Sequence, residues 1–487
     1  MFMDERRYDV WNEIRQHDLR AFSKLLTPTI FAEVAKRTDV RLGKSALHVG
    51  NLVWLGIAAA LHATQSFAFV LTMTLKVLQD QQHFAQTKLG KATKAGRKKG
   101  GKKASKHHPH RNDPTQVTEE AWSKARQRMP LAFWMELIVV LGERFQAAHQ
   151  ARLMYRGFRL LAADGTRLDL PNWPALRKYY GTARNKGGQH NAQARMVMLQ
   201  FPSVRLPYRY ELSPLGIGET TLLLRMVGHL HANDLVLLDA GYWSYGLFWA
   251  IQRRKASFAI RFRRGVQLKT LRSLGKDDRL VQWSPKDSRG KWRKEGLPKS
   301  IKLRAITYRV PGFRKQTILT NVLEPKRLSR EDWTRLTTEC PAGGKLAPGL
   351  YHRRWQIETT YDELKVVQGL DRTLRSRTPE SVAYEVAGHV VLYLLVRWLM
   401  VEAAAKHSLD PLQISFTNAL HELDSMRTSL IAASPHWAAT TLLPRLLDRI
   451  ASHQVQPRPG RHYPRRKKAA ASKKSRTRAS TKSRKKG

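Results

Sequence analysis

The sequence predicts an α/β protein in which a mixed sheet is flanked by helices, with an all-α region before it and further helices after it. Three observations favour this fold class. Residues 8–86 carry apolar residues at helical spacing, from about residue 156 short β-type runs alternate with helical ones, and from 341 to about 453 the pattern is helical again. Strands that alternate with helices are typical of an α/β layer structure. The length of 487 residues suffices for two or three domains.

Shifts in composition divide the chain into eight segments. They are an all-α N-terminal region (1–87), a basic linker (88–113), a helical lead-in (114–155), the first part of the α/β core (156–264), a β-rich insertion (265–340), the last helix of the core (341–380), C-terminal helices (381–455) and a basic tail (456–487). The linker and the tail have low sequence complexity and few apolar residues. We therefore expect both to be disordered.

The helical lead-in and the first strands follow from local patterns. Thr118 is expected to cap the helix VTEEAWSKARQRM, after which FWMELIVVLGERFQAA forms a second helix. GFRLLAAD is expected to form a strand that ends in Asp164 and is continued by TRLDLP. ARMVMLQFP and VRLPYRYEL have the pattern of two neighbouring strands.

The second half of the core repeats this rhythm of strands and helices. Helical TTLLLRMVGHL leads into the strand DLVLLDAG, which carries Asp239, and the helix SYGLFWAIQRR leads into the strand SFAIRFRRG. The insertion contains alternating runs such as SIKLRAITYRV and KQTILTNV, which predict strands.

The charge of the chain predicts a polyanionic partner. The formal net charge is +49, and 23 of the 87 Lys and Arg residues lie in two stretches without any acid, 88–111 and 461–487. The rest of the chain still holds 64 basic against 38 acidic residues. Nucleic acid or an acidic membrane would suit such a surface.

Cysteine content and hydropathy indicate a soluble cytoplasmic protein. Cys340 is the only cysteine, so no internal disulfide forms and a reducing compartment is expected. The N-terminus lacks the pattern of a secretory signal. The apolar run VVLYLLVRWLMV contains Arg397 and is predicted to be a buried helix, with no membrane partner.

The most informative segment is YHRRWQIETTYDELK, which begins at Tyr351. In a helix with about 100° per residue, Tyr351, Arg354, Glu358 and Lys365 share one stripe. Ile357, Leu364 and Val367 then fall on the opposite side, which a helix would bury. An acid flanked by two cations and a phenol suits a metal ligand beside a phosphate backbone. The alternative is an ordinary charged surface helix.

Two aspartates complete a candidate acidic site. Asp164 and Asp239 each end an apolar run and are closely followed by glycine, so each is expected at the tip of a strand. The alternative for either residue is an aspartate that forms a turn. Three carboxylates in one cleft repel each other unless divalent cations lie among them, and oxygen ligands favour Mg²⁺ or Mn²⁺. Two such ions about 4 Å apart support phosphoryl displacement.

The spacing Tyr-x2-Arg-x3-Glu-x6-Lys resembles the signature of the insertion-sequence-four family of bacterial DDE transposases. DGTRLDLP and LLDAGYWSYGLF are similar to the segments around the first and second catalytic aspartates of that family, and the resemblance covers roughly residues 115–425. It implies a ribonuclease-H-like catalytic core in which Asp164, Asp239 and Glu358 hold two Mg²⁺ ions, or Mn²⁺ in their place. Where the family often has arginine after the second aspartate, this chain has Ala240.

The same resemblance implies that Tyr351, Arg354 and Lys365 contact phosphates of the transposon end. Some members of the family form a DNA hairpin, and an aromatic side chain then takes up a flipped base. Trp355 and Trp292 are the candidates for that stacking contact, with plain packing as the alternative for both.

Two more acids of the signature compete with Glu358 for the metal. Asp362 lies close to Glu358 on the helical wheel and could assist a metal ion, and Glu363 is the second rival. The register of the signature favours Glu358.

The predicted function is that of a cut-and-paste DNA transposase. It would bind inverted terminal repeats, partly through region 1–87, cleave them with bound Mg²⁺ and join the 3′-hydroxyls to target DNA. Pairing two DNA ends implies a homodimer on DNA, in the bacterial cytoplasm near the nucleoid. The alternatives are a non-catalytic DNA-binding repressor derived from a transposase and a metal-dependent nuclease without strand transfer.

Overall fold

The computed structural model describes most of the chain between residues 20 and 455. The described ranges are 20–22, 24–42, 47–73, 117–183, 191–263, 265–286, 296–309, 315–334, 349–372 and 374–455. The described residues up to 454 belong to the larger of two units. The predictions for the linker, the basic tail, Trp292 and Cys340 concern residues outside the described ranges, and the predicted domain boundaries stay predictions.

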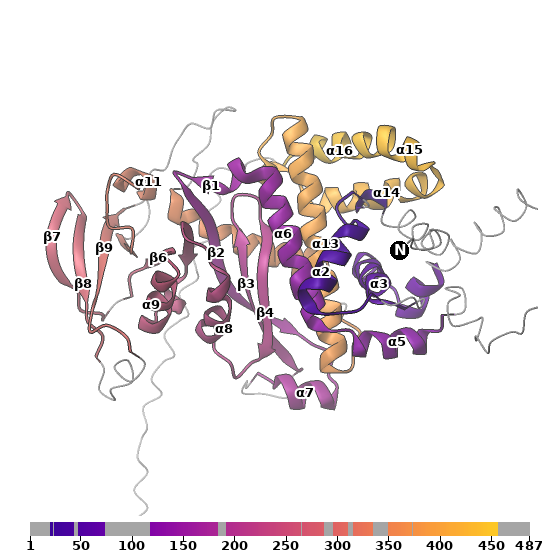
Figure 1. Ribbon diagram of the computed structural model, residues 1–487, viewed down its shortest axis with the longest axis horizontal. Coiled ribbons are helices and arrows are strands. Elements are labelled where there is room, and N and C mark those ends of the chain that lie inside the picture. The colour runs from indigo at the N-terminus through magenta and orange to yellow at the C-terminus, as the bar shows by residue number, and fades with distance from the viewer. Residues whose placement is uncertain are drawn as a thin grey trace, which may run out of the picture. The chain divides into compact units, whose positions relative to one another are not determined.

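A mixed sheet forms the centre of the larger unit (Figure 1). Its first strands are β1 (Met154–Tyr155), β2 (Phe158–Asp169), β3 (Gln193–Phe201), β4 (Leu206–Pro214), β5 (Asp234–Leu238) and β6 (Ser257–Arg261). The order is β4-β3-β2-β5-β6, with β2, β3 and β4 antiparallel and β2, β5 and β6 parallel. The sequence predicts β2 to β6 but not the short strand β1, and the mixed α/β class is confirmed.

The β-rich insertion extends this sheet. Its strands are β7 (Lys269–Gly275), β8 (Asp278–Trp283), β9 (Ile301–Tyr308) and β10 (Gln316–Thr320). β10 pairs with β6, and β9, β8 and β7 follow in antiparallel order. The exposed edge that β6 would otherwise present is thereby covered. The insertion is β-rich as predicted, and it continues the core sheet.

Two helices that pack on the sheet connect it to the N-terminal helices. α6 (Leu131–Leu153) and α13 (Pro379–Lys406) lie side by side next to β4 (Figure 1). α3 (Val49–Leu61) crosses α13 so closely that a Cβ atom on Gly388 would lie 2.6 Å from the carbonyl oxygen of Gly56. Glycine at position 388 is therefore required for this crossing.

α13 is a core helix. Its length and composition would allow it to span a membrane, but 94% of its most apolar window is buried within the fold. Arg397 lies in this helix with its side chain fully buried. The burial matches the prediction for the VVLYLLVRWLMV run.

The remaining helices surround these elements. They are α2 (Pro28–Thr38), α5 (Glu119–Arg128), α7 (Pro174–Tyr180), α8 (Glu219–Met226), α9 (Tyr245–Arg253), α11 (Arg330–Thr334), α14 (Phe416–Ala432), α15 (Pro435–Trp437) and α16 (Leu443–Ser452). Thr118 caps α5 as predicted, because its hydroxyl accepts a hydrogen bond from the Ala121 amide at 3.1 Å.

The signature segment is not the single α-helix that the sequence predicts. A 3₁₀ turn, η6 (Leu350–Trp355), leads into α12 (Gln356–Asp362), and a π-helical turn, η7 (Glu363–Val367), follows. The Gln368 amide donates to the Glu363 carbonyl five residues earlier, at 2.9 Å. This wider turn changes the register, so Ile357 and Leu364 are buried as predicted while Val367 is 38% exposed.

Candidate active site

The two aspartates lie on neighbouring parallel strands. β2 and β5 pair up to Ala163 and Leu238, so Asp164 is the next residue of β2 and Asp239 follows directly after the end of β5. Contrary to the prediction, Asp164 does not lie at the tip of its strand. β2 continues past it to Asp169 and pairs with β3 there. Asp164 is the first residue of β2 that no longer pairs with β5. The reason for the difference is that β3 supports β2 beyond the point where β5 stops.

The guanidinium of Arg354 gathers the three predicted acids. Its nitrogens lie 3.3 Å from a carboxylate oxygen of Asp164, 3.1 Å from one of Glu358 and 3.9 Å from one of Asp239. The Arg354 side chain is 6% exposed, whereas that of Glu358 is 53% exposed. Residues from positions 164, 239 and 358 of the sequence therefore meet around one buried cation.

The site carries an excess of negative charge. Burial raises the pKa of the Asp164 carboxyl to about 6, even though the Gly165 amide donates to it at 2.9 Å and Arg354 lies beside it. The nearby carboxylates of Asp239 and Glu358 raise it further. A carboxyl that resists ionisation for these reasons would be stabilised in its charged form by a divalent cation.

The chemistry of the donors fits Mg²⁺ or Mn²⁺, which prefer carboxylate oxygens. The three acids are spaced around Arg354, and within the described residues no group of three or more His, Cys, Asp or Glu side chains lies close enough to hold a metal ion. Asp164, Asp239 and Glu358 would hold such an ion once Arg354 exchanges its carboxylate contacts for other partners.

Tyr351 and Lys365 anchor the signature segment to the sheet. The Tyr351 hydroxyl donates to the Leu238 carbonyl at 2.8 Å and accepts from the Arg261 amide at 3.1 Å, and burial raises the pKa of Tyr351 to about 12. Lys365 donates to the Arg167 carbonyl and pairs with Asp371, both at 2.8 Å. These contacts offer no support for the phosphate contact predicted for Tyr351, and they occupy the ammonium of Lys365.

Trp355 keeps an open face. Its side chain is 50% exposed and lies edge-on to the His352 ring, with 5.0 Å between ring centroids. Together with Asp239, Arg261 and Arg354 it lines a small hollow beside the acids. An exposed indole at this place can stack on a nucleobase.

Asp362 and Glu363, the two acids that compete with Glu358 for the metal, differ in burial and in hydrogen bonding. Glu363 is buried, and its oxygens accept from Arg205 at 3.0 Å, from Tyr393 at 2.6 Å and from Arg397. Both of its oxygens are therefore engaged in the core, away from the other acids. Asp362 is exposed at the end of α12.

Two residues near the site have no signal in the sequence. Glu219 at the start of α8 covers Gly165 so closely that a Cβ atom there would lie 2.5 Å from the Glu219 carboxyl carbon. Arg261 lies 3.9 Å from a carboxylate oxygen of Asp239. It places a cation beside the second aspartate, where Ala240 lacks one. Only the fold brings α8 and the end of β6 to this place.

Comparison with known proteins identifies the domain that carries these acids. Residues 156–395 match the family model described as a transposase DDE domain. The chain is 29% identical over 303 residues to the transposase InsG for insertion sequence element IS4 of Escherichia coli (strain K12), a match that covers 61% of this chain and 63% of InsG. It is 26% identical over 140 residues to the putative transposase InsZ of the same organism, covering 28% of this chain and 47% of InsZ. The matches thus span less than two thirds of each relative.

A solved structure of a piggyBac transposase synaptic complex with hairpin DNA is also similar, with a TM-score of 0.32 and 13% identity over 62% of this chain and 58% of that one. The assignment depends instead on the family match, which contains all three acids, and on InsG. Residues 156–395 thus match a transposase DDE domain, and the chain is similar in sequence to the IS4 transposase InsG.

Proposed function

We propose that this chain is a cut-and-paste DNA transposase that cleaves element ends by Mg²⁺-dependent phosphodiester hydrolysis and joins the 3′-hydroxyls to target DNA. The observation that carries the proposal is the meeting of Asp164, Asp239 and Glu358 around the guanidinium of Arg354. A ribonuclease-H-like core accounts for this placement, because it brings two strand-borne aspartates and a glutamate from a later helix to one end of a sheet.

Each side chain of the site has a distinct role in this proposal. Asp164, Asp239 and Glu358 hold the divalent ions, whose chemistry is to activate water or a 3′-hydroxyl and to stabilise the leaving oxygen. Arg354 changes partners from carboxylates to a phosphate oxygen, which a planar guanidinium binds well. Trp355 stacks on a base near the cut.

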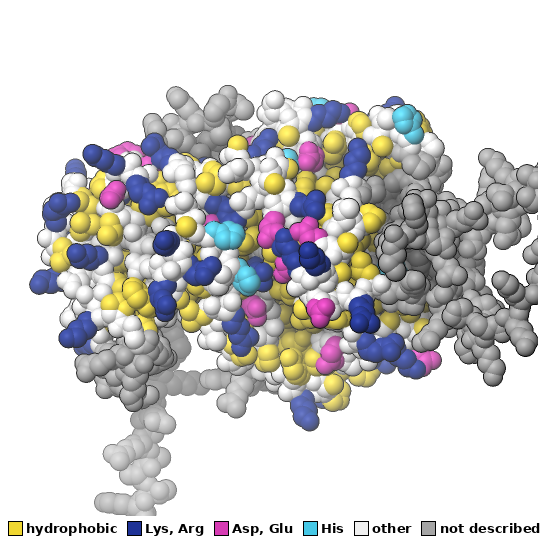
Figure 2. All heavy atoms as spheres, in the orientation of Figure 1, with side chains coloured by type: hydrophobic (Ala, Val, Ile, Leu, Met, Phe, Trp, Pro, Cys, Tyr) yellow, Lys and Arg dark blue, Asp and Glu magenta, His cyan; other side chains and the backbone are white. Residues whose placement is uncertain are grey.

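The surface of the chain supports a DNA partner. Lys and Arg side chains are scattered over the face in Figure 2 among hydrophobic and uncharged atoms, and a group of acidic side chains lies near its middle. Cations around an acidic centre would hold a DNA backbone while the acids bind metal ions. We further propose that two copies of the chain act together on paired ends, in the cytoplasm near the nucleoid.

Cleavage by an aspartate variant tests the catalytic assignment. The substrate is a linear DNA that contains the gene with its flanking sequence, incubated with Mg²⁺. Asp164→Asn should lower the cleavage rate by about a thousandfold or more, since loss of one essential group of a cooperating set removes most of the catalysis, and should leave DNA binding within twofold. Asp169→Asn is the matched control, because Asp169 lies on the same strand and its carboxylate accepts from the Gln193 amide at 2.6 Å.

Unchanged cleavage by Asp164→Asn would reject the assignment. Transfer of a labelled 3′ end into a second plasmid separates a transposase from a nuclease without strand transfer. DNA binding by the unaltered chain with no cleavage in Mg²⁺ or Mn²⁺ would instead favour the repressor.

A further inference from the structure

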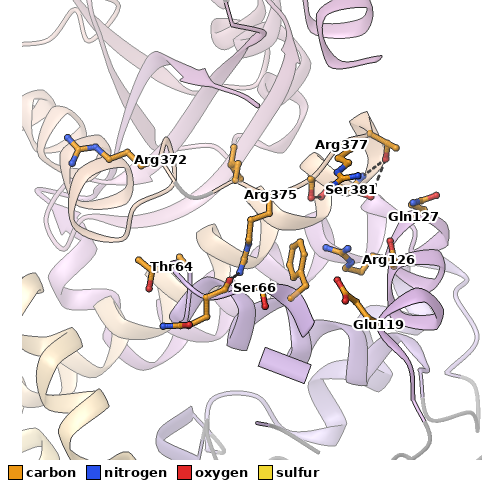
Figure 3. A pocket seen from close by; sticks show the side chains of 16 residues that line it. Thr64, Ser66, Glu119, Arg126, Gln127, Arg372, Arg375, Arg377 and Ser381 are labelled. Atoms are coloured by element: carbon orange, nitrogen blue, oxygen red, sulfur yellow. Dashed lines mark hydrogen bonds between the residues drawn. The ribbon is translucent and has the colours of Figure 1, made fainter. Parts of the chain in front are cut away.

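A second pocket, separate from the acidic site, opens between the N-terminal helices and the segment that follows the signature. It has a volume of about 960 Å³ and shares no lining residue with the carboxylate site. Its walls come from residues 63–67 after α3, from one face of α5, and from Arg372, residues 374–378 and Ser381 before and at the start of α13. Figure 3 shows these three walls around the hollow. Such a volume exceeds that of a phosphate ion and is near the upper end for small-molecule sites.

The walls of this pocket are strongly basic. Arg126, Arg372, Arg375 and Arg377 line it, and among the lining residues that the structure describes Glu119 is the one acid. Figure 3 shows Arg372 at the left of the view, Arg375 near its centre, and Arg377 and Arg126 at the right. A concave surface with this balance of charge concentrates anions.

Arg375 is already used by the fold. It pairs with the buried carboxylate of Glu385 at 3.1 Å, and its other nitrogens donate to the carbonyls of Ala59, at 2.9 Å, and Gln65. These bonds fix the wall formed by residues 63–67. Arg375 is therefore a structural part of the pocket.

Arg126, by contrast, has no anionic partner in the described part of the chain. It is 6% exposed, and its Nε and Nη1 atoms are buried without any hydrogen-bond acceptor. Its guanidinium lies 3.7 Å from the centre of the Phe67 ring, whose surroundings also include Arg375 at 4.0 Å. A buried cation with unsatisfied N–H groups is costly unless an anion pairs with it.

The start of α13 adds a second source of positive potential. This helix has 28 residues and begins at the pocket wall, with Thr378 as its N-cap. The N-terminus of a long helix attracts anions through its free backbone N–H groups and its dipole. The helix end and the unpaired Arg126 therefore favour the same kind of ligand.

We propose that this pocket binds the phosphate backbone of a DNA segment away from the scissile bond. The inference rests on the proposed function as a DNA transposase. Backbone recognition is favoured over base recognition because Phe67, the only aromatic ring among the described lining residues, is covered by two guanidinium groups. The contact is thus independent of DNA sequence, and it ties the N-terminal helices and the catalytic segment to one DNA molecule.

A salt series with the full-length chain tests the proposal. The probe is a fluorescein-labelled 40-base-pair duplex of arbitrary sequence, and the dissociation constant is measured by anisotropy at several salt concentrations. Arg126→Gln should weaken binding by about five- to tenfold and reduce the slope of log K against log salt by about 0.9, which is the loss of one phosphate contact. Arg377→Gln, on the exposed rim of the pocket, should weaken binding in the same direction.

Arg128→Gln is the matched control, because it removes the same charge from the same helix outside the pocket. It should leave the slope unchanged. Equal effects of Arg126→Gln and Arg128→Gln, or no effect of Arg126→Gln in a chain with unaltered melting temperature, would overturn the proposal. If Arg126→Gln does not fold, an unchanged salt slope in Arg377→Gln overturns it.

Two further measurements complete the test. The first distinguishes DNA from free phosphate as the ligand of the pocket, and the second tests the proposed transposase function separately from the pocket. Strong competition by millimolar inorganic phosphate with an unchanged DNA slope in the variants would assign the pocket to a small anion and overturn the DNA assignment. Cleavage is scored independently: an unaltered chain that binds DNA without cutting it refutes the proposed function, while the salt slopes still decide the pocket.

Discussion

The sharpest test of the fold around the site is the removal of one charge from Glu363. This residue lies five positions after Glu358, yet its carboxylate faces the core and accepts from Arg205, Tyr393 and Arg397. It thus connects the signature segment to α13 and to the turn between β3 and β4. Arg397 is fully buried and the Arg205 side chain is 13% exposed.

Glu363→Gln should lower the free energy of unfolding by about 3–5 kcal/mol. The substitution leaves two buried guanidinium groups side by side without a negative charge, and breaking a buried ion pair from one side costs about that much. Such a loss is large against a total stability of about 5–15 kcal/mol. The measurement is a urea titration followed by circular dichroism and tryptophan fluorescence.

Two substitutions in the same segment are the controls. Asp362→Asn, at an exposed position, should change the unfolding free energy by less than about 0.5 kcal/mol. Glu358→Gln should leave stability equal or higher, because it removes a carboxylate from a crowded group, and it should abolish cleavage. A cost below about 1 kcal/mol for Glu363→Gln would refute the role of Glu363 in the core.

The acid limb of the stability curve gives an independent check of the same network. Burial acts to raise the pKa of Glu363, but Arg397 and Arg205 outweigh it, so the pKa in the folded chain is lowered. A carboxylate of this kind contributes stability above its unfolded pKa of about 4.3 and loses that contribution as the pH falls through the folded pKa. Glu363→Gln should therefore show a shallower loss of stability in acid than the unaltered chain.

Three further predictions address the surroundings of the site. Burial lowers the pKa of His389 to about 3, so the chain takes up a proton when it unfolds between pH 3 and pH 6.5. The free energy of unfolding should therefore fall by up to about 1.4 kcal/mol for each pH unit between pH 6.5 and pH 3. His389→Gln should remove this dependence in urea titrations at pH 4 and 7. Gly165→Ala should lower the free energy of unfolding by about 1–3 kcal/mol, because the added methyl group pushes against the Glu219 side chain. Adding Glu219→Ala to the same chain should recover most of this loss. Purely additive effects of the two substitutions would exclude the contact. Tyr351→Phe should lower stability by about 1–3 kcal/mol, because a buried carbonyl and an amide lose their partner, and a selective loss of DNA affinity at unchanged stability would instead restore the phosphate contact.

Much of the fold follows from local signals in the sequence. The apolar runs that became β2 to β6 are short and bounded by turns, and Thr118 precedes a helix as capping residues do. The order of the strands in the sheet, by contrast, does not follow from local signals. That β10 pairs with β6, and so makes the insertion part of the core sheet, depends on contacts between distant segments that no local pattern specifies.

The acids of the site were found because each is marked by its neighbours in the sequence, Asp164 and Asp239 by apolar runs and Glu358 by the spacing of the signature. Glu219 and Arg261 carry no such mark, since each lies on an element whose own pattern is ordinary. A period of 3.6 residues per turn predicts a buried Val367, and this prediction is wrong. Val367 is exposed because a π-turn adds a residue to one turn of the helix, which no regular helical period anticipates.

The spacing of the signature has a physical explanation in the way the segment docks on β2. Arg354 contacts the Asp164 carboxylate, the Tyr361 hydroxyl donates to the Asp164 carbonyl at 2.7 Å, and Lys365 reaches the Arg167 carbonyl. These three residues are seven and four positions apart, so one side of the helical segment contacts β2 twice at Asp164 and once more at Arg167, three residues further along the strand. Glu358, between the first two contacts, is thereby held over the acids while its own side chain stays exposed. A substitution that breaks the Lys365 anchor should therefore act on the position of Glu358, and its effect on cleavage should exceed its effect on DNA binding.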